Sequence, residues 1–233
     1  IFAEFPGEKF KTGITGFSRT GESGKDAVIV NPLQATVLGA RRLGFAGSSI
    51  LEAGGQHARF ISIDSGEQCS IREFAINDVC ASGSGMFIEQ QAGRLKMSLE
   101  EFSELAASAP RAVAIAGRCA VFAKSDMIHM QQKGVEISEL ARGLCDAISR
   151  NLLAMLLKGR EIVPPVFIAG GCAANRGIIK AFKSNPALQG DGKLVVSPLP
   201  GLEAALGAAI LAERARSEGV SLELAGKFLK QFV

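Results

Sequence analysis

The chain alternates between short apolar runs and longer stretches with helical periodicity. The short runs are rich in β-branched residues and phenylalanine and are bounded by turn-forming residues, which predicts strands. The predicted strands cover 49–53, 59–63, 70–76, 111–116, 166–169 and 193–196. Gly54, Gly55 and Gln56 separate the first two, so these two are expected to form a β-hairpin. Residues 1–26 predict only a short strand, a turn and a loop.

In the longer stretches, apolar residues recur every three to four positions, which predicts helices. Pro32 follows Asn31 at the favoured first position of a helix, and Ser98 with Glu101 forms a capping box. The predicted helices cover 32–43, 86–96, 98–107, 125–132, 138–157, 175–184, 203–215 and 220–233. Strands and helices in this order place the chain in the α/β class.

Composition limits the classes of function. The 233 residues are 47% apolar and carry a net charge of +3, with a mean hydropathy of +0.23. Acidic and basic residues are mixed throughout, so we expect no nucleic-acid partner and no membrane surface. No apolar run is long enough to cross a bilayer, and residues 1–10 do not resemble a signal peptide. Five cysteines without paired spacing favour a reducing compartment, so a cytoplasmic globular protein is expected.

Cys80 lies in the stretch NDVCASGSG (77–85), directly before a predicted helix for which Ser82 or Ser84 is a natural N-cap. A thiolate at this place faces unpaired backbone N–H groups and the positive end of the helix dipole. The stretch therefore suits a metal-bound or reactive sulfur. A buried structural cysteine in a connection rich in glycine and serine is the alternative.

A second cysteine, Cys119, lies in the stretch GRCAVF (117–122) and again follows a glycine and precedes a predicted helix. Two cysteines at similar loop-to-helix entrances suggest a pair of ligands. Two thiolates are too few for a zinc or iron–sulfur site, which usually has four protein ligands. If the pair binds a cluster, a second chain must supply the other two thiolates.

Two Gly-Gly pairs each follow a predicted buried strand. Glycine allows the backbone to approach a ligand closely, and a strand, Gly-Gly turn and helix in a parallel sheet often present backbone amides to a nucleotide. Glu52, just before Gly54 and Gly55, is placed to hold a metal ion or a water molecule. An ordinary hairpin is the alternative. The stretch GESGKD (21–26) is not a Walker A loop, because it lacks the hydroxyl residue after lysine.

Four motifs together resemble the BadF/BadG/BcrA/BcrD ATPase family, the activators of 2-hydroxyacyl-CoA dehydratases and the ATPase subunits of benzoyl-CoA reductase. They are EAGGQ (52–56), NDxCASGSG (77–85), CxVFAxSD (119–126) and GGxAxN (170–175). The resemblance extends over roughly residues 12–215. Two cysteine motifs in order between two Gly-Gly motifs make it specific.

The resemblance implies the actin-like ATPase fold of acetate kinase, sugar kinases, Hsp70 and actin, with mixed sheets flanked by helices. It also implies ATP or ADP with Mg²⁺ as ligands. Glu52 and Gln56 would be catalytic. The residues implied to bind the nucleotide are Gly54, Gly55, Gly170, Gly171 and Asn175.

By the same resemblance, Cys80 and Cys119 would bind a [4Fe–4S] cluster shared across a homodimer or with a paired homologous subunit. ATP hydrolysis would then drive a low-potential electron into a partner dehydratase or reductase that acts on CoA esters. The chain would be an ATP-dependent iron–sulfur electron-transfer component.

The chain departs from the family pattern at three places. The first phosphate loop of the N-terminal lobe is missing, His57 stands where an aspartate is usual, and LQAT (33–36) replaces an expected glutamate. We therefore expect three parts: an incomplete N-terminal lobe at 1–48, a nucleotide- and cluster-binding lobe at 49–216, and a helical tail at 217–233.

Two other functions remain open. One is a non-hydrolysing assembly module of the same fold, which His57 and the missing loop favour. The other is a sugar or acetate kinase relative with structural cysteines, which would need a catalytic aspartate where only Glu52 is available. Cys69, Cys145 and Cys172 are interpreted as structural.

Overall fold

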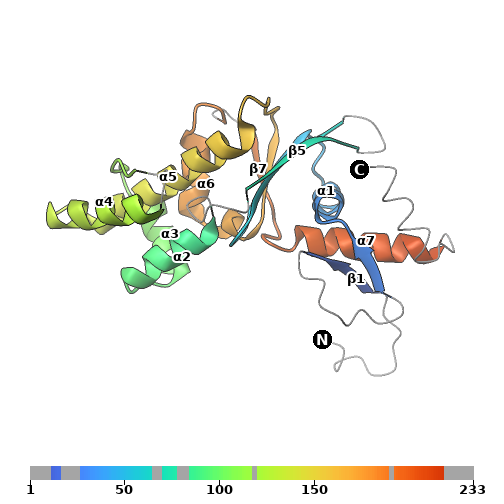
Figure 1. Ribbon diagram of the computed structural model, residues 1–233, viewed down its shortest axis with the longest axis horizontal. Helices are drawn as coiled ribbons and strands as arrows, with labels where there is room; N and C mark the ends of the chain where they lie inside the picture. The colour runs from blue at the N-terminus through green and yellow to red at the C-terminus, as the bar shows by residue number, and fades with distance from the viewer. Residues whose placement is uncertain are drawn as a thin grey trace, which may run out of the picture. The chain divides into compact units, whose positions relative to one another are not determined.

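The computed structural model describes residues 12–16, 27–64, 70–77, 84–116, 120–188 and 192–217 (Figure 1). The chain forms two compact units. One combines the residues up to Gly44 with those from Leu202 onward, and the other spans Phe45–Gly201. The predicted parts 1–48, 49–216 and 217–233 divide the chain differently, because residues 45–48 belong to the second unit and the helix Glu203–Ser217 belongs to the first.

The unit Phe45–Gly201 is built on a five-stranded sheet in the order β5-β4-β3-β6-β7. β3 pairs antiparallel with β4 and parallel with β6, so the sheet is mixed, as predicted. The strands are β3 (Ser49–Ala53), β4 (Ala58–Ile63), β5 (Ile71–Asn77), β6 (Val166–Ala169) and β7 (Leu194–Val196). The predicted hairpin at 49–63 and the predicted strand at 193–196 are both confirmed, and the latter lies at the edge of the sheet.

The two faces of this sheet carry different sets of alternating side chains. On one face, Leu51, Phe60 and Ile168 enter the main hydrophobic core, which the helices of this unit complete. On the other face, Ile50 and Phe167 are fully buried, and Phe167 packs against the ring of Phe45 at a centroid distance of 5.1 Å. Burial on both faces explains why the central strands are almost continuously apolar.

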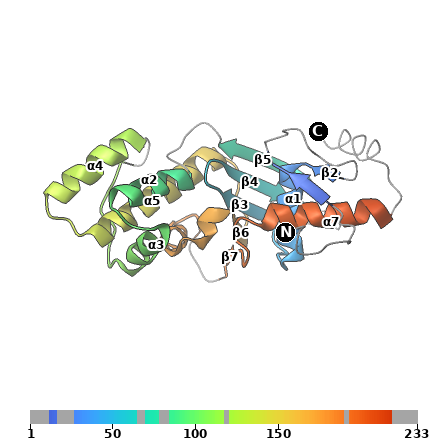
Figure 2. The ribbon, with the colours of Figure 1, turned by 90° about the horizontal axis from the view of Figure 1, so that it is seen from below.

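In the described part of this unit, α-helices α2 to α6 and the 3₁₀ turn η3 complete the structure, and the helices lie on one side of the sheet (Figures 1 and 2). The predicted capping box is confirmed, because the Ser98 hydroxyl accepts from Glu101 N–H and the Glu101 carboxylate accepts from Ser98 N–H. The helices of this unit are α2 (Gly85–Arg94), α3 (Leu99–Ser108), α4 (Ala120–Gln132), α5 (Ile137–Leu157), η3 (Gly171–Ala174) and α6 (Arg176–Ser184).

The predicted strand at 111–116 is wrong. This segment has no strand partner in the described sheet and runs as irregular chain along α5. Its apolar character comes from Ile115, which is 4% exposed and belongs to the main core. Side chains of neighbouring helices, instead of a sheet, bind its backbone: Arg150 donates to Ile115 O and Asp126 accepts from Ala116 N–H.

Helix α4 begins at Ala120, five residues before the predicted start at 125. Ala123 and Met127 lie four residues apart and are both buried, so the early residues share the apolar face that holds the helix in place. In both views α4 lies farthest from the sheet (Figures 1 and 2).

The other unit contains the parallel pair β1 (Thr12–Thr15) and β2 (Ala27–Val30) with α1 (Pro32–Arg42) and α7 (Glu203–Ser217). Helices α1 and α7 cross at very short range. A Cβ on Gly39 would lie 1.9 Å from Glu203 O, and one on Gly207 would lie 1.9 Å from Ala35 O. Glycines on both helices therefore allow their backbones to pack closely.

Among the described residues, none of the helices is both long and apolar enough to span a bilayer. The helix predicted at 220–233 lies outside the described residues.

Candidate functional site

The two Gly-Gly pairs lie at the same edge of the sheet. β3 and β6 run parallel in register, with Glu52 opposite Ala169, so the residues that follow both strands emerge side by side. A Cβ on Gly170 would lie 2.5 Å from Ala53 O, which places the second pair directly against the end of β3. The structure thus brings together the four glycines that the sequence predicted at a nucleotide site.

Within the second pair, the two glycines have different roles. Gly170 has a φ of +84° and no room for a side chain, so the backbone itself requires glycine there. Gly171 has no positive φ, and a Cβ on it would meet no described atom within 4 Å. Gly171 is exposed, and the described residues leave its side-chain direction open, so a ligand can approach its backbone from that direction.

The first pair follows the same plan. A Cβ on Gly54 would lie 3.0 Å from His57 O, whereas a Cβ on Gly55 would meet nothing described within 4 Å. Gly54 N–H donates to His57 O at 2.8 Å and closes the hairpin tip. Gly54 N–H is therefore already engaged, and a phosphate would have to use later amides, those of the exposed residues Gly55 and Gln56.

Glu52 pairs across the hairpin with Arg59. One guanidinium nitrogen, Nη1, lies 3.1 and 3.3 Å from the two carboxylate oxygens, and the Arg59 and Glu52 side chains are 7% and 18% exposed. The pair fixes the orientation of the carboxylate two residues before Gly54. A metal ion or water molecule bound by Glu52 would therefore share the carboxylate with the guanidinium of Arg59.

The first turn of α2 is bound by the hairpin tip. Gly85 N–H donates to Gly54 O at 2.9 Å, and Met86 N–H donates to Gly55 O at 2.8 Å. Ser84, one of the two residues predicted as N-cap, occupies the N-cap position of α2. Its side chain makes no capping hydrogen bond to the helix. Two orphan N–H groups of the helix are thus satisfied by backbone carbonyls of the Gly-Gly loop.

The thiol of Cys172 lies at the same junction. Its sulfur is 3.5 Å from Gly54 O, and a Cβ on Gly85 would lie 2.9 Å from it. The carbonyl of Gly54 therefore contacts both Cys172, which follows the second Gly-Gly pair, and Gly85 at the start of α2. Gly54, Gly85 and Cys172 belong to three separate sequence motifs, and only the fold shows that they are in contact.

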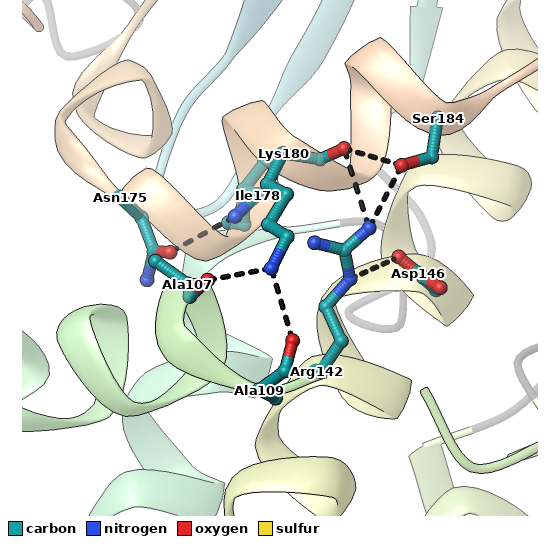
Figure 3. Close-up of polar contacts among 8 residues, drawn as sticks. All are labelled: Ala107, Ala109, Arg142, Asp146, Asn175, Ile178, Lys180 and Ser184. Atoms are coloured by element: carbon teal, nitrogen blue, oxygen red, sulfur yellow. Dashed lines mark hydrogen bonds and ion pairs between the residues drawn. The ribbon is translucent and has the colours of Figure 1, made fainter. Parts of the chain in front are cut away.

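Asn175 has a demonstrable role in the fold. Its Oδ1 accepts from Ile178 N–H at 3.0 Å and caps the N-terminus of α6 (Figure 3). This cap positions the helix that follows the Gly170–Gly171 loop. The predicted contact of Asn175 with a nucleotide stays a prediction.

Two cationic side chains fix α6 behind this loop (Figure 3). Lys180 Nζ donates to Ala107 O and Ala109 O, at 2.6 and 2.9 Å, at the C-terminal end of α3. Arg142 Nη2 donates to Ser184 Oγ at 2.9 Å and to Lys180 O at 3.3 Å, at the other end of α6. Positive charges at helix C-termini are favourable, so the network gives the loop a rigid support.

The predicted metal ligands Cys80 and Cys119 lie outside the described residues, as does Cys69. Cys145 and Cys172 are free and buried. Burial raises the pKa of Cys172 to about 11, and burial followed by the charge of Asp146 raises the pKa of Cys145 further. Both thiols stay protonated at neutral pH, as expected of structural cysteines. Within the part of the chain that the structure describes, no three His, Cys, Asp or Glu side chains are grouped to hold a metal.

The fold and the paired glycine loops define an ATPase domain of the actin-like kind. The model of the BadF/BadG/BcrA/BcrD ATPase family matches residues 7–212, and the chain belongs to this family.

Relatives of known activity support this assignment. The activator of lactoyl-CoA dehydratase from Anaerotignum propionicum is 31% identical over 204 residues, which cover 88% of this chain and 76% of the relative. The (R)-2-hydroxyglutaryl-CoA dehydratase activating ATPase from Acidaminococcus fermentans is 28% identical over 198 residues, 85% and 73% of the two chains. One of the subunits of benzoyl-CoA reductase from Thauera aromatica is 28% identical over 149 residues, 64% and 51%.

Solved structures confirm the predicted fold. The activator of 2-hydroxyisocaproyl-CoA dehydratase from Clostridium difficile, with bound ADPNP, has a TM-score of 0.76 at 24% identity, over 93% of this chain and 75% of that one. Component A of the Acidaminococcus fermentans (R)-2-hydroxyglutaryl-CoA dehydratase has a TM-score of 0.73 at 26% identity, over 82% and 71%.

Proposed function

We propose that this protein is an ATP-dependent iron–sulfur electron-transfer component that activates, or delivers electrons to, an enzyme acting on CoA esters. The observation that carries the proposal is the junction of the two Gly-Gly loops with the first turn of α2. Gly55 and Gly171 face open space there, and the carbonyls of Gly54 and Gly55 bind the helix that follows Cys80.

The nucleotide would bind with its phosphates at the hairpin tip and its adenosine at the other loop. Gly55 and Gln56 would offer backbone amides to the phosphates, and the open backbone at Gly171 would accept the nucleoside. Glu52, oriented by Arg59, would hold a Mg²⁺ ion or the attacking water. Gln56 would orient that water from the tip of the hairpin.

The donor set fits a shared iron–sulfur cluster. The described thiols, Cys145 and Cys172, are buried and protonated, so they do not compete as ligands. Cys80 and Cys119 would supply two thiolates from each chain, and a second chain would complete the four. When bound, the cluster would supply a one-electron carrier of low potential.

A homodimer would also cover apolar surface on α4. Phe122, three residues after Cys119, is 65% exposed, and Ile128 on the same helix is 43% exposed. A large apolar side chain as exposed as Phe122 is a candidate contact at such an interface. A two-fold axis near Cys119 would bring Phe122 of both chains together.

The partner enzyme follows from the relatives. Three of them are described as activators of dehydratases that act on lactoyl-, 2-hydroxyglutaryl- and 2-hydroxyisocaproyl-CoA, and a fourth belongs to benzoyl-CoA reductase. We extend to this chain only what they share, which is a CoA-ester dehydratase or reductase as the recipient of the electron.

A second function is favoured by one observation at the hairpin. Glu52 is paired with Arg59, and the neighbouring position carries His57 where the family usually has an acid. An imidazole is a poor ligand for a hard cation such as Mg²⁺. The alternative is a module that binds nucleotide or cluster without hydrolysing ATP.

One experiment separates these functions. The protein is purified without oxygen and reconstituted with iron and sulfide, and iron content and ATP hydrolysis are then measured on the same sample. Iron together with hydrolysis supports the electron-transfer component, and iron without hydrolysis supports the assembly module. Hydrolysis by a protein that takes up no iron would overturn both.

A further inference from the structure

The segment 111–116, which leads into Cys119, is fixed in place without belonging to a sheet. Val113 N–H donates to Glu139 O at 3.3 Å, Arg150 Nη2 donates to Ile115 O at 3.3 Å, and the Arg111 side chain pairs with the Glu139 carboxylate, so α5 binds the segment at three points. The Ile115 side chain is buried in the main core. Irregular backbone that is anchored this closely has a defined position despite its lack of regular structure.

Asp126 adds a further contact to this segment, from α4. Its Oδ2 accepts from Ala116 N–H at 2.7 Å. Asp126 lies in the second turn of α4, whereas Ala116 precedes that helix in sequence. The carboxylate therefore joins the two chain segments that flank residues 117–119, and the hydrogen bond to an ionised group is among the stronger kinds.

The helix that carries Asp126 is anchored to the main core by two buried side chains. Ala123 and Met127, on either side of it, are 1% and 2% exposed and pack in the main core. A side chain on a well-packed helix can transmit its position to the backbone it binds, whereas one on a loose helix cannot.

We infer that Asp126 is a positioning residue for the metal ligand Cys119, with Arg150 as a second anchor on the same segment. The inference rests on the proposed cluster-binding role of Cys119. Asp126 fixes the backbone three residues before that thiolate, so the thiolate loses less conformational freedom when it binds iron. A merely local role would be to close the start of α4.

The test compares four variants of the full chain. Asp126→Ala removes the acceptor, Asp126→Asn keeps an acceptor oxygen at the same place, and Arg150→Met removes the second anchor. Glu89→Ala, which removes an exposed carboxylate from α2, is the matched control. Thermal unfolding followed by circular dichroism establishes that each variant folds.

The first readout needs no iron. Amide exchange at Ala116, followed by mass spectrometry or NMR, is expected to be roughly tenfold faster in Asp126→Ala and close to wild type in Asp126→Asn. If exchange at Ala116 is unchanged by Asp126→Ala, the contact does not protect the backbone and the inference is overturned.

The second readout is the rate at which a chelator removes iron from the anaerobically reconstituted protein. Asp126→Ala and Arg150→Met are expected to lose iron roughly tenfold faster, with Asp126→Asn and Glu89→Ala near wild type. If amide exchange is faster but iron loss is unchanged in both Asp126→Ala and Arg150→Met, Asp126 only closes the start of α4 and the inference is overturned. A wild type that binds no iron would refute the proposed function, and the exchange result would still test the contact. If Asp126→Ala fails to fold, Arg150→Met alone decides, because its side chain is exposed.

Discussion

The backbone N–H of Gly85 donates a 2.9 Å hydrogen bond to the carbonyl of Gly54, which joins the first turn of α2 to the tip of the β3–β4 hairpin. The same tip carries Gly55, whose backbone is open to a ligand. A displacement of the tip by a bound phosphate would therefore act directly on the helix that follows Cys80, because the two are joined backbone to backbone.

The first prediction concerns Gly85. A Cβ there would lie 2.9 Å from Cys172 Sγ and 3.3 Å from Gly54 O, so Gly85→Ala must displace the Cys172 thiol and press on the hairpin tip. We expect the affinity for ATP, measured by calorimetry, to fall roughly tenfold, because the amides of the tip are displaced. Gly93→Ala, on the same helix with no described neighbour within 4 Å, is the control. It should leave affinity unchanged and raise helix stability by about 0.5–1 kcal/mol. Equal affinity in both variants would show that the junction does not govern the site.

The second prediction separates the two glycines after β6. Gly171→Ala should unfold at the wild-type temperature, because its Cβ meets no described atom, but should weaken nucleotide binding where a ligand approaches the backbone. Gly170→Ala should lose about 1–3 kcal/mol of stability, because alanine is strained at a φ of +84° and its Cβ would lie 2.5 Å from Ala53 O. Thermal unfolding and calorimetry measure the two effects. Normal ATP binding by Gly171→Ala would remove this loop from the proposed site.

The third prediction concerns Glu52. Glu52→Gln keeps the shape of the side chain and a hydrogen-bond acceptor for Arg59, so the fold should persist while ATP hydrolysis falls on the order of 100-fold. Glu52→Ala leaves the guanidinium of Arg59 buried without its carboxylate and should cost roughly 3 kcal/mol of stability. Much of that loss should return in the double variant Glu52→Ala, Arg59→Met.

The control for Glu52 is Glu73→Gln on β5, which lies two strands away from β3 in the same sheet. Glu73 forms a half-exposed pair with Arg160, and such pairs contribute about 0–1 kcal/mol, so neither stability nor hydrolysis should change much. If Glu52→Gln hydrolyses ATP at the wild-type rate, Glu52 has no part in catalysis.

The fourth prediction concerns the cluster and the dimer. Cys80→Ser and Cys119→Ser should each abolish iron uptake, whereas Cys145→Ala should keep it, because Cys145 is buried away from solvent. The reconstituted wild type should contain about two iron atoms per chain, half of a four-iron cluster. Light scattering should show it as a dimer, with both serine variants shifted towards monomer. A four-iron monomer, or a dimer that both variants leave intact, would contradict a cluster shared between chains.

The sequence by itself determined which elements form and which residue types end them. The apolar runs at 49–53, 59–63 and 166–169 predicted buried strands, and glycine pairs after two of them marked the edge at which a ligand can approach. The capping box at Ser98 and the proline after Asn31 fixed helix starts through local chemistry alone. Such features depend on a few neighbouring residues, so they can be read without the fold.

The tertiary structure decided everything that depends on contacts between distant segments. Residues 111–116 look like a strand in isolation, yet Ile115 enters a core made by helices and the backbone is bound by Asp126 and Arg150 instead of by a neighbouring strand. The sequence also did not show which glycine of a pair the backbone requires. A Cβ on Gly170 would clash with Ala53, whereas a Cβ on Gly171 would meet no described atom within 4 Å. The pattern of neighbouring residues carries no information about which distant segment packs against a given residue. Only the folded structure shows these contacts.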